Sequence, residues 1–393
     1  MAYFLIILAG LSLGIWIVFS FFRGAFWQVR RFDRDNARID MPARWPRVMV
    51  AVPARNEGAT IGRCVESLVA QDYTGEFPII IVDDHSEDET GARARAAAQL
   101  ARAGQVSLLQ AAPPEPGWTG KLWALQEGIN QAASISPDYF WFTDADIVHA
   151  PDTLRRLVAR AEQDRLDLAS LMVLLQAKTM PERLLIPAFL YFFLMLYPPK
   201  WIANAKSKTA GAAGGCILLR KAALERIGGI SAIRAEVIDD CALARAVKRS
   251  GGAIWMGLTR KSVSLRAYET FGEVRDLIAR TAFTQLGYSG LVLAGTVAGM
   301  LLTYLVPLVL TFAVQSIVWR LSLAAWALMT LTYLPTVRFY ELSALWAPLL
   351  PMAALFYSYA TWLSAWRYWM KRGGQWKGRV QAVAKTSGEA QNH

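Results

Sequence analysis

Short apolar runs alternate with segments of helical periodicity between about residues 47 and 285. Runs that are apolar throughout are typical of strands buried on both faces, and their alternation with helices favours a mostly parallel sheet covered on both sides. We therefore expect an α/β domain of the Rossmann-like type. The predicted strands are 48–52, 77–82, 106–109, 139–142 and 168–176, and the predicted helices are 59–70, 89–103, 121–133, 151–163, 238–249 and 271–285.

An uncharged apolar stretch precedes this domain. Residues 3–22 carry no charge and are long enough to cross a bilayer. No basic segment precedes the stretch and no cleavage site of small residues follows it, so we expect an uncleaved anchor. Positive charge marks the cytoplasmic flank of a span, which places the domain inside. The basic residues that follow the stretch are Arg23, Arg30, Arg31, Arg34 and Arg38.

Further apolar stretches follow the domain, with candidate spans at 291–318, 321–337 and 342–366. One span before the domain and three after it would leave the C-terminus outside. The basic tail, with Lys371, Arg372, Lys377 and Arg379, indicates the inside instead. Either the middle segment, 321–337, is re-entrant or split, or the tail is an exception to the rule that positive charge marks the cytoplasmic side. The predicted division is a transmembrane anchor (1–23), a basic linker (24–46), the α/β domain (47–285), a C-terminal membrane region of about three helices (286–370) and a basic polar tail (371–393).

One apolar segment within the domain, residues 184–197, is too short to span comfortably and contains Pro187. We expect a helix at the membrane surface, with a buried core helix as the alternative.

The chain of 393 residues is 54% hydrophobic and has a formal net charge of +11. Its basic residues gather beside the apolar stretches and in the tail, without the interleaved aromatics of a nucleic-acid surface. This placement favours anionic lipid headgroups and a phosphorylated ligand, and we expect no nucleic-acid partner. The three cysteines, Cys64, Cys216 and Cys241, have no metal-ligand spacing, which favours free thiols.

The strongest candidate for chemistry is Asp144-Ala145-Asp146, at the end of the predicted strand 139–142. Two carboxylates this close repel unless a cation neutralises them, and Mg²⁺ and Mn²⁺ favour such oxygen ligands. Strand ends are also where open α/β sheets bind ligands. The alternative is a helix cap, because Asp152 and Thr153 open the next helix. His149 is either a partner of these acids or an ordinary loop histidine.

Three further positions have a functional and an ordinary interpretation. Asp84 ends the second strand and is either a nucleotide contact or part of a helix cap. Lys121 opens a helix, where it either meets a phosphate or is solvated. Asp239 and Asp240 open another helix: adjacent charge and burial favour a general base, whereas acids at a helix N-terminus are also common for electrostatic reasons.

Taken in order, these motifs resemble the family 2 glycosyltransferases with a GT-A fold. The matching stretches are VPARNE (52–57), VDDHSEDET (82–90), GKLWAL (120–125), TDAD (143–146), GGCILLRKAALERIGG (214–229) and IDDCAL (238–243). The resemblance implies a nucleotide-sugar pocket with a metal, Mg²⁺ or Mn²⁺. It implies that the nucleotide-sugar is bound by Pro53, Arg55, Glu57, Asp84, Lys121 and Asp144, and the metal by Asp144 and Asp146.

The resemblance also implies that Asp240 deprotonates the acceptor. Because Asp239 stands where the family usually has Glu, the choice between these two acids stays open. Arg280 would face the leaving diphosphate. The Arg-Trp pair of processive synthases is missing, and ARTAFTQLGYS (279–289) with GWTGKLWAL (117–125) resembles the hopene-associated glycosyltransferases of bacteria.

The sequence therefore predicts a multi-pass protein of the bacterial inner membrane with its catalytic domain in the cytoplasm. It would be an inverting glycosyltransferase that moves sugar from a nucleotide-sugar, expected to be a UDP-sugar, to a lipid acceptor such as a hopanoid. The alternatives are a polyprenyl-phosphate sugar transferase, a polysaccharide synthase, or an inactive membrane scaffold that kept the fold.

Overall fold

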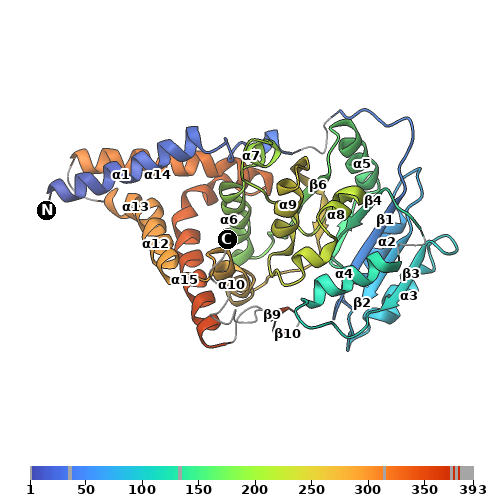
Figure 1. Ribbon diagram of the computed structural model, residues 1–393. Coiled ribbons are helices and arrows are strands. Elements are labelled where there is room, and N and C mark those ends of the chain that lie inside the picture. The colour runs from blue at the N-terminus through green and yellow to red at the C-terminus, as the bar shows by residue number, and fades with distance from the viewer. Residues whose placement is uncertain are drawn as a thin grey trace.

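The computed structural model describes residues 2–33, 38–131, 135–312, 316–371, 375–376 and 379–380. Arg34 of the predicted linker and nearly all side chains of the predicted basic tail lie outside this part of the chain. Figure 1 shows an α/β domain from which an arm of long helices extends, with the N-terminus at the tip of the arm.

The domain is built on one eight-stranded sheet with the order β3-β2-β1-β4-β7-β6-β8-β5. Strands β1 to β4 are parallel, and β6 pairs in parallel with β8. Strand β7 runs antiparallel to β4 and β6, and β5 runs antiparallel to β8. The prediction of a mostly parallel α/β sheet is confirmed. The strands are β1 (Val48–Ala54), β2 (Ile79–Asp83), β3 (Val106–Gln110), β4 (Tyr139–Phe142), β5 (Ile147–His149), β6 (Leu168–Leu174), β7 (Ile217–Arg220) and β8 (Ile254–Ser264).

Both faces of the sheet are buried, as the apolar runs predict. In β1, Val48, Val50 and Val52 join the core on one face, whereas Met49 and Ala51 join the core on the other. This alternation follows from the two-residue repeat of a strand. Each such side chain contributes about 1.5–3 kcal/mol when fully buried. The first core also contains residues of α2, α3 and α5, and the second contains residues of α4, α6 and α9.

The helices of the domain lie near their predicted positions, with ends that differ by a few residues. They are α2 (Ile61–Val69), α3 (Thr90–Ala98), α4 (Gly120–Gln131), α5 (Thr153–Gln163), α6 (Met180–Leu196), α7 (Pro199–Ala203), α8 (Lys221–Arg226), α9 (Asp239–Arg249), α10 (Phe271–Ala279) and α11 (Ala282–Gln285), with 3-10 turns η1 (Val29–Arg31) and η3 (Ile230–Ile233).

The predicted helix 271–285 is wrong in one respect, because it is split into α10 and α11. In a continuous helix the Phe283 amide would donate to the Ala279 carbonyl. Instead Ser364, on α15 (Leu350–Trp369), inserts its hydroxyl: Oγ donates to Ala279 O at 2.5 Å and accepts from Phe283 N at 3.1 Å. A side chain inserted in this way breaks the helical ladder.

The arm contains α1 (Ala2–Phe22) and the helices that follow the domain. In the described residues, four helical stretches are long and apolar enough to cross a membrane: Ala2–Phe22, Met180–Ala203, Gly290–Leu310 and Ile317–Phe339. The predicted span 291–318 ends earlier, and α15 is absent from this group although a span was predicted at 342–366. The elements are α12 (Gly290–Met300), a π-helical turn η4 (Leu301–Leu305), α13 (Val306–Leu310), α14 (Ser316–Phe339), the 3-10 helix η5 (Ala344–Leu349) and, beyond α15, the short strands β9 (Gln375–Trp376) and β10 (Arg379–Val380).

The packing of α6 supports its interpretation as a buried core helix over that as a helix at the membrane surface. It packs against α10, α14 and α15, and most of its residues are buried. Its Tyr191 hydroxyl lies 2.8 Å from Thr332 Oγ1 on α14, and its Leu185 carbonyl accepts a hydrogen bond from the Tyr357 hydroxyl on α15. The helix is therefore a core element that joins the domain to the arm.

Candidate active site

A cavity of about 570 Å³ lies at the carboxyl ends of β1 and β4 and extends to α6 and α10. Ligand pockets of proteins commonly have volumes of about 300–1,000 Å³. Its wall is unusually rich in charge. The ionisable residues of the wall include Glu57, Lys121, Asp144, Asp146, Glu236, Asp239, Asp240, Arg266, Glu273, Asp276 and Arg280.

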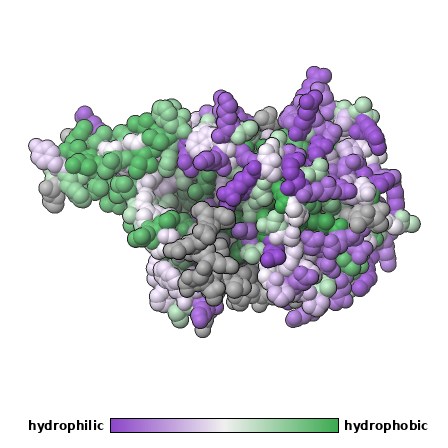
Figure 2. Space-filling model, in the orientation of Figure 1, coloured by the Kyte–Doolittle hydropathy of each residue, from purple (hydrophilic) through white to green (hydrophobic). Residues whose placement is uncertain are grey.

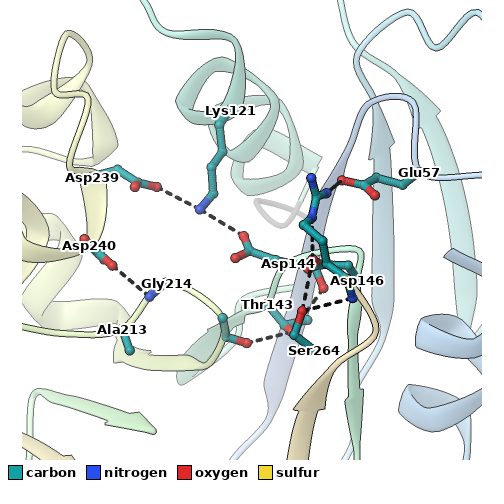
Figure 3. Close-up of polar contacts among 12 residues, drawn as sticks. Glu57, Lys121, Thr143, Asp144, Asp146, Ala213, Gly214, Asp239, Asp240 and Ser264 are labelled. Carbon is teal, nitrogen blue, oxygen red and sulfur yellow. Dashed lines mark hydrogen bonds and ion pairs between the residues drawn. The ribbon is translucent and has the colours of Figure 1, made fainter. Parts of the chain in front are cut away.

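Lys121 joins two of the acidic motifs. It is the second residue of α4, and its Nζ lies 2.9 Å from Asp144 Oδ1 and 3.1 Å from Asp239 Oδ2 (Figure 3). Burial alone would lower the pKa of Lys121, but Asp144 and Asp239 raise it above its ordinary value. Burial likewise opposes ionisation of Asp144, but the Lys121 ammonium holds the pKa of that carboxyl below its ordinary value. Both groups are therefore charged at neutral pH.

Arg266 neutralises the second aspartate of the loop. It follows β8, and its Nε lies 3.0 Å from Asp146 Oδ2 while its Nη2 lies 2.6 Å from Glu57 Oε1. Burial lowers the pKa of Arg266, but Glu57 and Asp146 outweigh it and raise the value. Arg266 was not among the predicted site residues, because β8 was not among the predicted strands. A functional side chain directly after a strand is the signal that would have found it.

Asp240 is held in place by hydrogen bonds from two backbone amides. It lies in the first turn of α9, where its Oδ2 accepts from Gly214 N at 2.9 Å (Figure 3). Its Oδ1 accepts from Cys241 N at 2.7 Å. Burial and the neighbouring Asp239 raise the pKa of Asp240 to about 6, against the opposing effect of Lys121. A carboxyl with this pKa is deprotonated at pH 7 yet basic enough to take a proton. Asp239 pairs with Lys121, so the two acids have different partners in this structure.

Arg55 and Asp84 are not among the residues that line this cavity, and their role in binding the nucleotide-sugar stays a prediction. Asp84 is fully buried, and Arg55 Nη1 lies 3.6 Å from its Oδ2. The two loops that carry these residues also bond to each other, through Asn56 N to Ser86 Oγ and Glu57 N to Thr90 Oγ1. Arg55 and Asp84 therefore hold the two loops together in this structure.

The other predicted residues do meet at the cavity. Pro53 and Glu57 come from β1 and the loop after it, and Arg280 comes from the end of α10. Arg280 also contributes positive potential at Asp144. Segments more than 200 residues apart in the sequence thus converge on one charged wall.

His85, His149 and Cys241 are not among the residues that line this wall. His149 is buried, with Nε2 at 2.8 Å from Thr143 Oγ1 and Nδ1 at 2.8 Å from Ser262 Oγ. Burial lowers the pKa of His149 to about 3, so the ring is neutral and structural. His85 Nδ1 lies 3.5 Å from Asp84 Oδ1, and Cys241 is buried in packing.

A divalent ion fits this donor set only as a partner of a bound ligand. No group of three His, Cys, Asp or Glu side chains able to hold a metal occurs in the described ranges. Two carboxylates completed by substrate phosphates are nevertheless a common Mg²⁺ arrangement. Asp144 and Asp146 have the right chemistry for it, and such an ion would share them with Lys121 and Arg266 or displace these cations.

Comparisons with known proteins find a matching family and a similar fold. The family described as Glycosyl transferase family 2 matches residues 49–228. A mannosyltransferase from Pyrobaculum calidifontis, solved with GDP-Man and Mn²⁺, has 17% sequence identity and a TM-score of 0.53, with 88% of this chain and 99% of that chain covered. This likeness identifies the fold as GT-A-like.

A second solved structure is less similar in fold, and one protein matches in sequence over a short stretch. Glucosyl-3-phosphoglycerate synthase from Mycobacterium tuberculosis, solved with Mn²⁺, UDP-glucose and glycerol 3-phosphate, has 21% identity and a TM-score of 0.37, over 62% of this chain and 80% of that chain. An uncharacterised Mycobacterium tuberculosis protein is 45% identical over 51 residues, which are 13% of this chain and 15% of that protein. The chain therefore spans only a small part of that curated relative.

Proposed function

We propose that the protein is a membrane-bound inverting glycosyltransferase, because residues 49–228 match the family described as Glycosyl transferase family 2. It takes sugar from a nucleotide-sugar, with UDP-sugars as the first candidates, and transfers it to the hydroxyl of a lipid. The observation that carries this proposal is the placement of Asp240, a carboxyl with a raised pKa, in the same cavity wall as Asp144 and Asp146.

The donor end of the cavity suits a diphosphate. Asp144 and Asp146 would hold Mg²⁺ or Mn²⁺ together with the diphosphate, and such an ion stabilises negative charge on a leaving group. The mannosyltransferase with the same fold was solved with Mn²⁺ and a nucleotide-sugar. Lys121, Arg266 and Arg280 add fixed positive charge around the same place.

The reaction is a single displacement at the anomeric carbon. Asp240 takes the proton of the acceptor hydroxyl, whose oxygen forms the new bond to the carbon as the bond to the diphosphate oxygen breaks. The hydrogen bonds from Gly214 N and Cys241 N fix the carboxylate before the acceptor arrives. Inversion follows because one displacement occurs from the face opposite the leaving group.

The acceptor end of the cavity is apolar and close to the arm. Phe189 and Phe193 of α6 line it, and α6 packs against α14 and α15. Hydrophobic surface is gathered over the arm, while the α/β domain is mostly hydrophilic (Figure 2). An amphiphilic acceptor could therefore keep its apolar part beside the arm and present its hydroxyl to Asp240. A hopanoid is the lipid to test first, because of the sequence resemblance.

The test uses the full chain in nanodiscs with a bacterial lipid extract, hopanoids included, and radiolabelled UDP-glucose, UDP-galactose or GDP-mannose. We expect label in a single-sugar lipid with one donor, lost in Asp240→Asn and retained in Asp164→Asn, whose side chain forms a surface pair with Arg160. No lipid label with any donor would refute the proposal. A ladder of long products would identify a polysaccharide synthase, and a product labile to mild acid would identify a polyprenyl-phosphate sugar transferase.

A further inference from the structure

Helix α15 exposes a row of large side chains and packs mainly small side chains against the protein. The outward residues, which we call the α15 stripe, are 39–52% exposed and recur every three or four positions, so they form one helical face. The members of the α15 stripe are Met352, Leu355, Tyr359, Trp362, Trp366 and Trp369. The buried face is made largely of small residues, including Ala353, Ala354, Ala360, Ser364 and Ala365.

The packing of α15 explains the buried face, whereas the stripe is exposed in the part of the chain that the structure describes. The helix packs on α10 and α11, with further contacts to α6 and α12. Its Ser364 is inserted between α10 and α11, so this face is fixed on the domain. A continuous exposed face of large apolar side chains on a protein surface marks an interaction site.

The composition of the stripe favours the headgroup region of a bilayer over its hydrocarbon core. Four of its six members are Trp or Tyr, the residues that concentrate at membrane–water interfaces because their rings are amphipathic. The middle of α1 differs, because its exposed large side chains are the aliphatic Ile7, Leu11, Ile17 and Val18, and the exposed aromatic side chains of α1 lie at the two ends of the helix. The two surfaces therefore suit different depths of one membrane.

The orientation of α15 relative to α1 also agrees with different depths for the two helices in one membrane. Figure 1 shows α1 and α14 side by side along the arm, whereas α15 crosses the arm steeply where it meets the domain. Helices α1 and α14 are in extensive contact, and α1 is tied to η4 by Trp16 Nε1, which donates to Thr303 O at 2.8 Å. The last aromatic residue of α15, Trp369, contacts the region of Gly290, where α12 begins. The stripe is thus continuous with the base of the arm.

We infer that α15 lies flat in the headgroup layer on the domain side of the membrane, with the α15 stripe against lipid. The chain then crosses the membrane three times, by α1, by α12 to α13, and by α14. The inference rests on the membrane location in the proposed function but does not depend on the reaction.

This topology removes the conflict between the number of spans and the charge of the tail. With three crossings, the C-terminus and the domain are on the same side, which is where Lys371 and the basic residues after it belong. The domain end of the arm is basic as well. Arg30 and Arg31, after α1, line one pocket with Arg338 at the end of α14, so the two helices end at the same level.

Cysteine labelling tests the topology. The chain's own cysteines, Cys64, Cys216 and Cys241, are free and buried, so they give little background. Single variants Lys371→Cys, Leu100→Cys in the domain and Phe312→Cys at the tip of the arm are treated with a membrane-impermeant maleimide in right-side-out and inside-out vesicles. We expect positions 371 and 100 to label from one side and position 312 from the other. Labelling of 371 from the same side as 312 would overturn the inference.

Depth measurement tests the orientation of α15 itself. Spin labels at Leu355→Cys, Trp362→Cys and Trp369→Cys are spaced by seven residues, or about 10 Å each along a helix. In nanodiscs, a flat helix gives three equal, shallow depths from the ratio of oxygen to nickel-chelate accessibility. A spanning helix gives depths that differ by about 20 Å, and protection from both reagents means that protein covers the stripe. Either result would overturn the inference, whether or not the protein transfers sugar.

Leu323→Cys on α14 is the matched control. Its side chain is exposed on the arm, within a helix long and apolar enough to span. We expect it to be deeper than all three positions of α15.

Discussion

Replacing Arg266 by methionine tests how the acidic wall of the cavity is held together. Arg266 bridges Glu57 and Asp146, whose side chains are each only 13% exposed, while its own side chain is 33% exposed. Methionine keeps much of the apolar length of arginine but removes the charge and every donor. The variant therefore leaves two largely buried carboxylates without the cation that they share.

The expected loss in the free energy of unfolding depends on how deeply the paired side chains are buried. Breaking a buried ion pair by removing one partner costs about 3–5 kcal/mol. Because Arg266 is one third exposed, solvent screening reduces the effect, and we expect a loss of roughly 2 kcal/mol. Arg155→Met is the matched control: Arg155 is 30% exposed, and its Nε lies 3.0 Å from Asp72, but that carboxylate is 44% exposed. We expect this surface pair to be worth less than about 1 kcal/mol.

The assay is thermal unfolding of the purified full chain in detergent, with and without Mn²⁺. Arg266→Met should melt below Arg155→Met, and Mn²⁺ should raise its melting temperature more than that of the unaltered protein, because an ion that binds the folded state stabilises it. If Arg266→Met is as stable as Arg155→Met, the interpretation of Arg266 as the neutralising cation is wrong.

The remaining predictions concern the other groups of the site. The raised pKa of Asp240 predicts that kcat falls as the pH drops through about 6, because the proton acceptor becomes protonated; Asp240→Asn should lower kcat by about 10²–10⁴-fold at pH 7.5 with donor binding retained. Lys121→Met should raise the donor KM about tenfold or more, whereas Lys221→Met, at a loose surface pair with Glu225, should not. A methyl group at Gly214 would lie 3.3 Å from Lys121 Nζ and 3.4 Å from Asp240 Oδ2, so Gly214→Ala should reduce kcat with little change in melting temperature. His149 is held neutral, with a folded pKa of about 3. Since the unfolded ring binds a proton near pH 6.5, stability should fall as the pH is lowered below that value, and His149→Gln should flatten this slope in urea unfolding.

The local pattern predicts a strand where it falls on an apolar run. Strands β1, β2 and β4 fall on such runs, and the sequence locates them within two residues of their ends. Strand β5 has only three residues, and β7, with four residues, ends in an arginine, so neither has a clear pattern. Strand β8 carries Arg260 and Lys261 near its end, which conceals its pattern.

The parts of the site that the sequence missed depend on contacts between distant segments. Arg266 was overlooked because its strand was overlooked. The break between α10 and α11 comes from Ser364, more than 80 residues away. A pattern in the local sequence cannot report an interaction of this kind.

The charge of the cavity explains why donor and cation should bind together. The protein has a formal net charge of +11, yet eight acidic and three basic side chains line the cavity. A diphosphate entering this wall alone would meet net negative charge in a partly buried space, where repulsion is only weakly screened. A divalent ion alone would compete with Lys121 and Arg266 for Asp144 and Asp146. Entering as one complex, the ion supplies the positive charge that the wall lacks, and the diphosphate supplies the oxygens that two carboxylates cannot. The acidic wall therefore favours a metal-bound nucleotide-sugar over either component by itself.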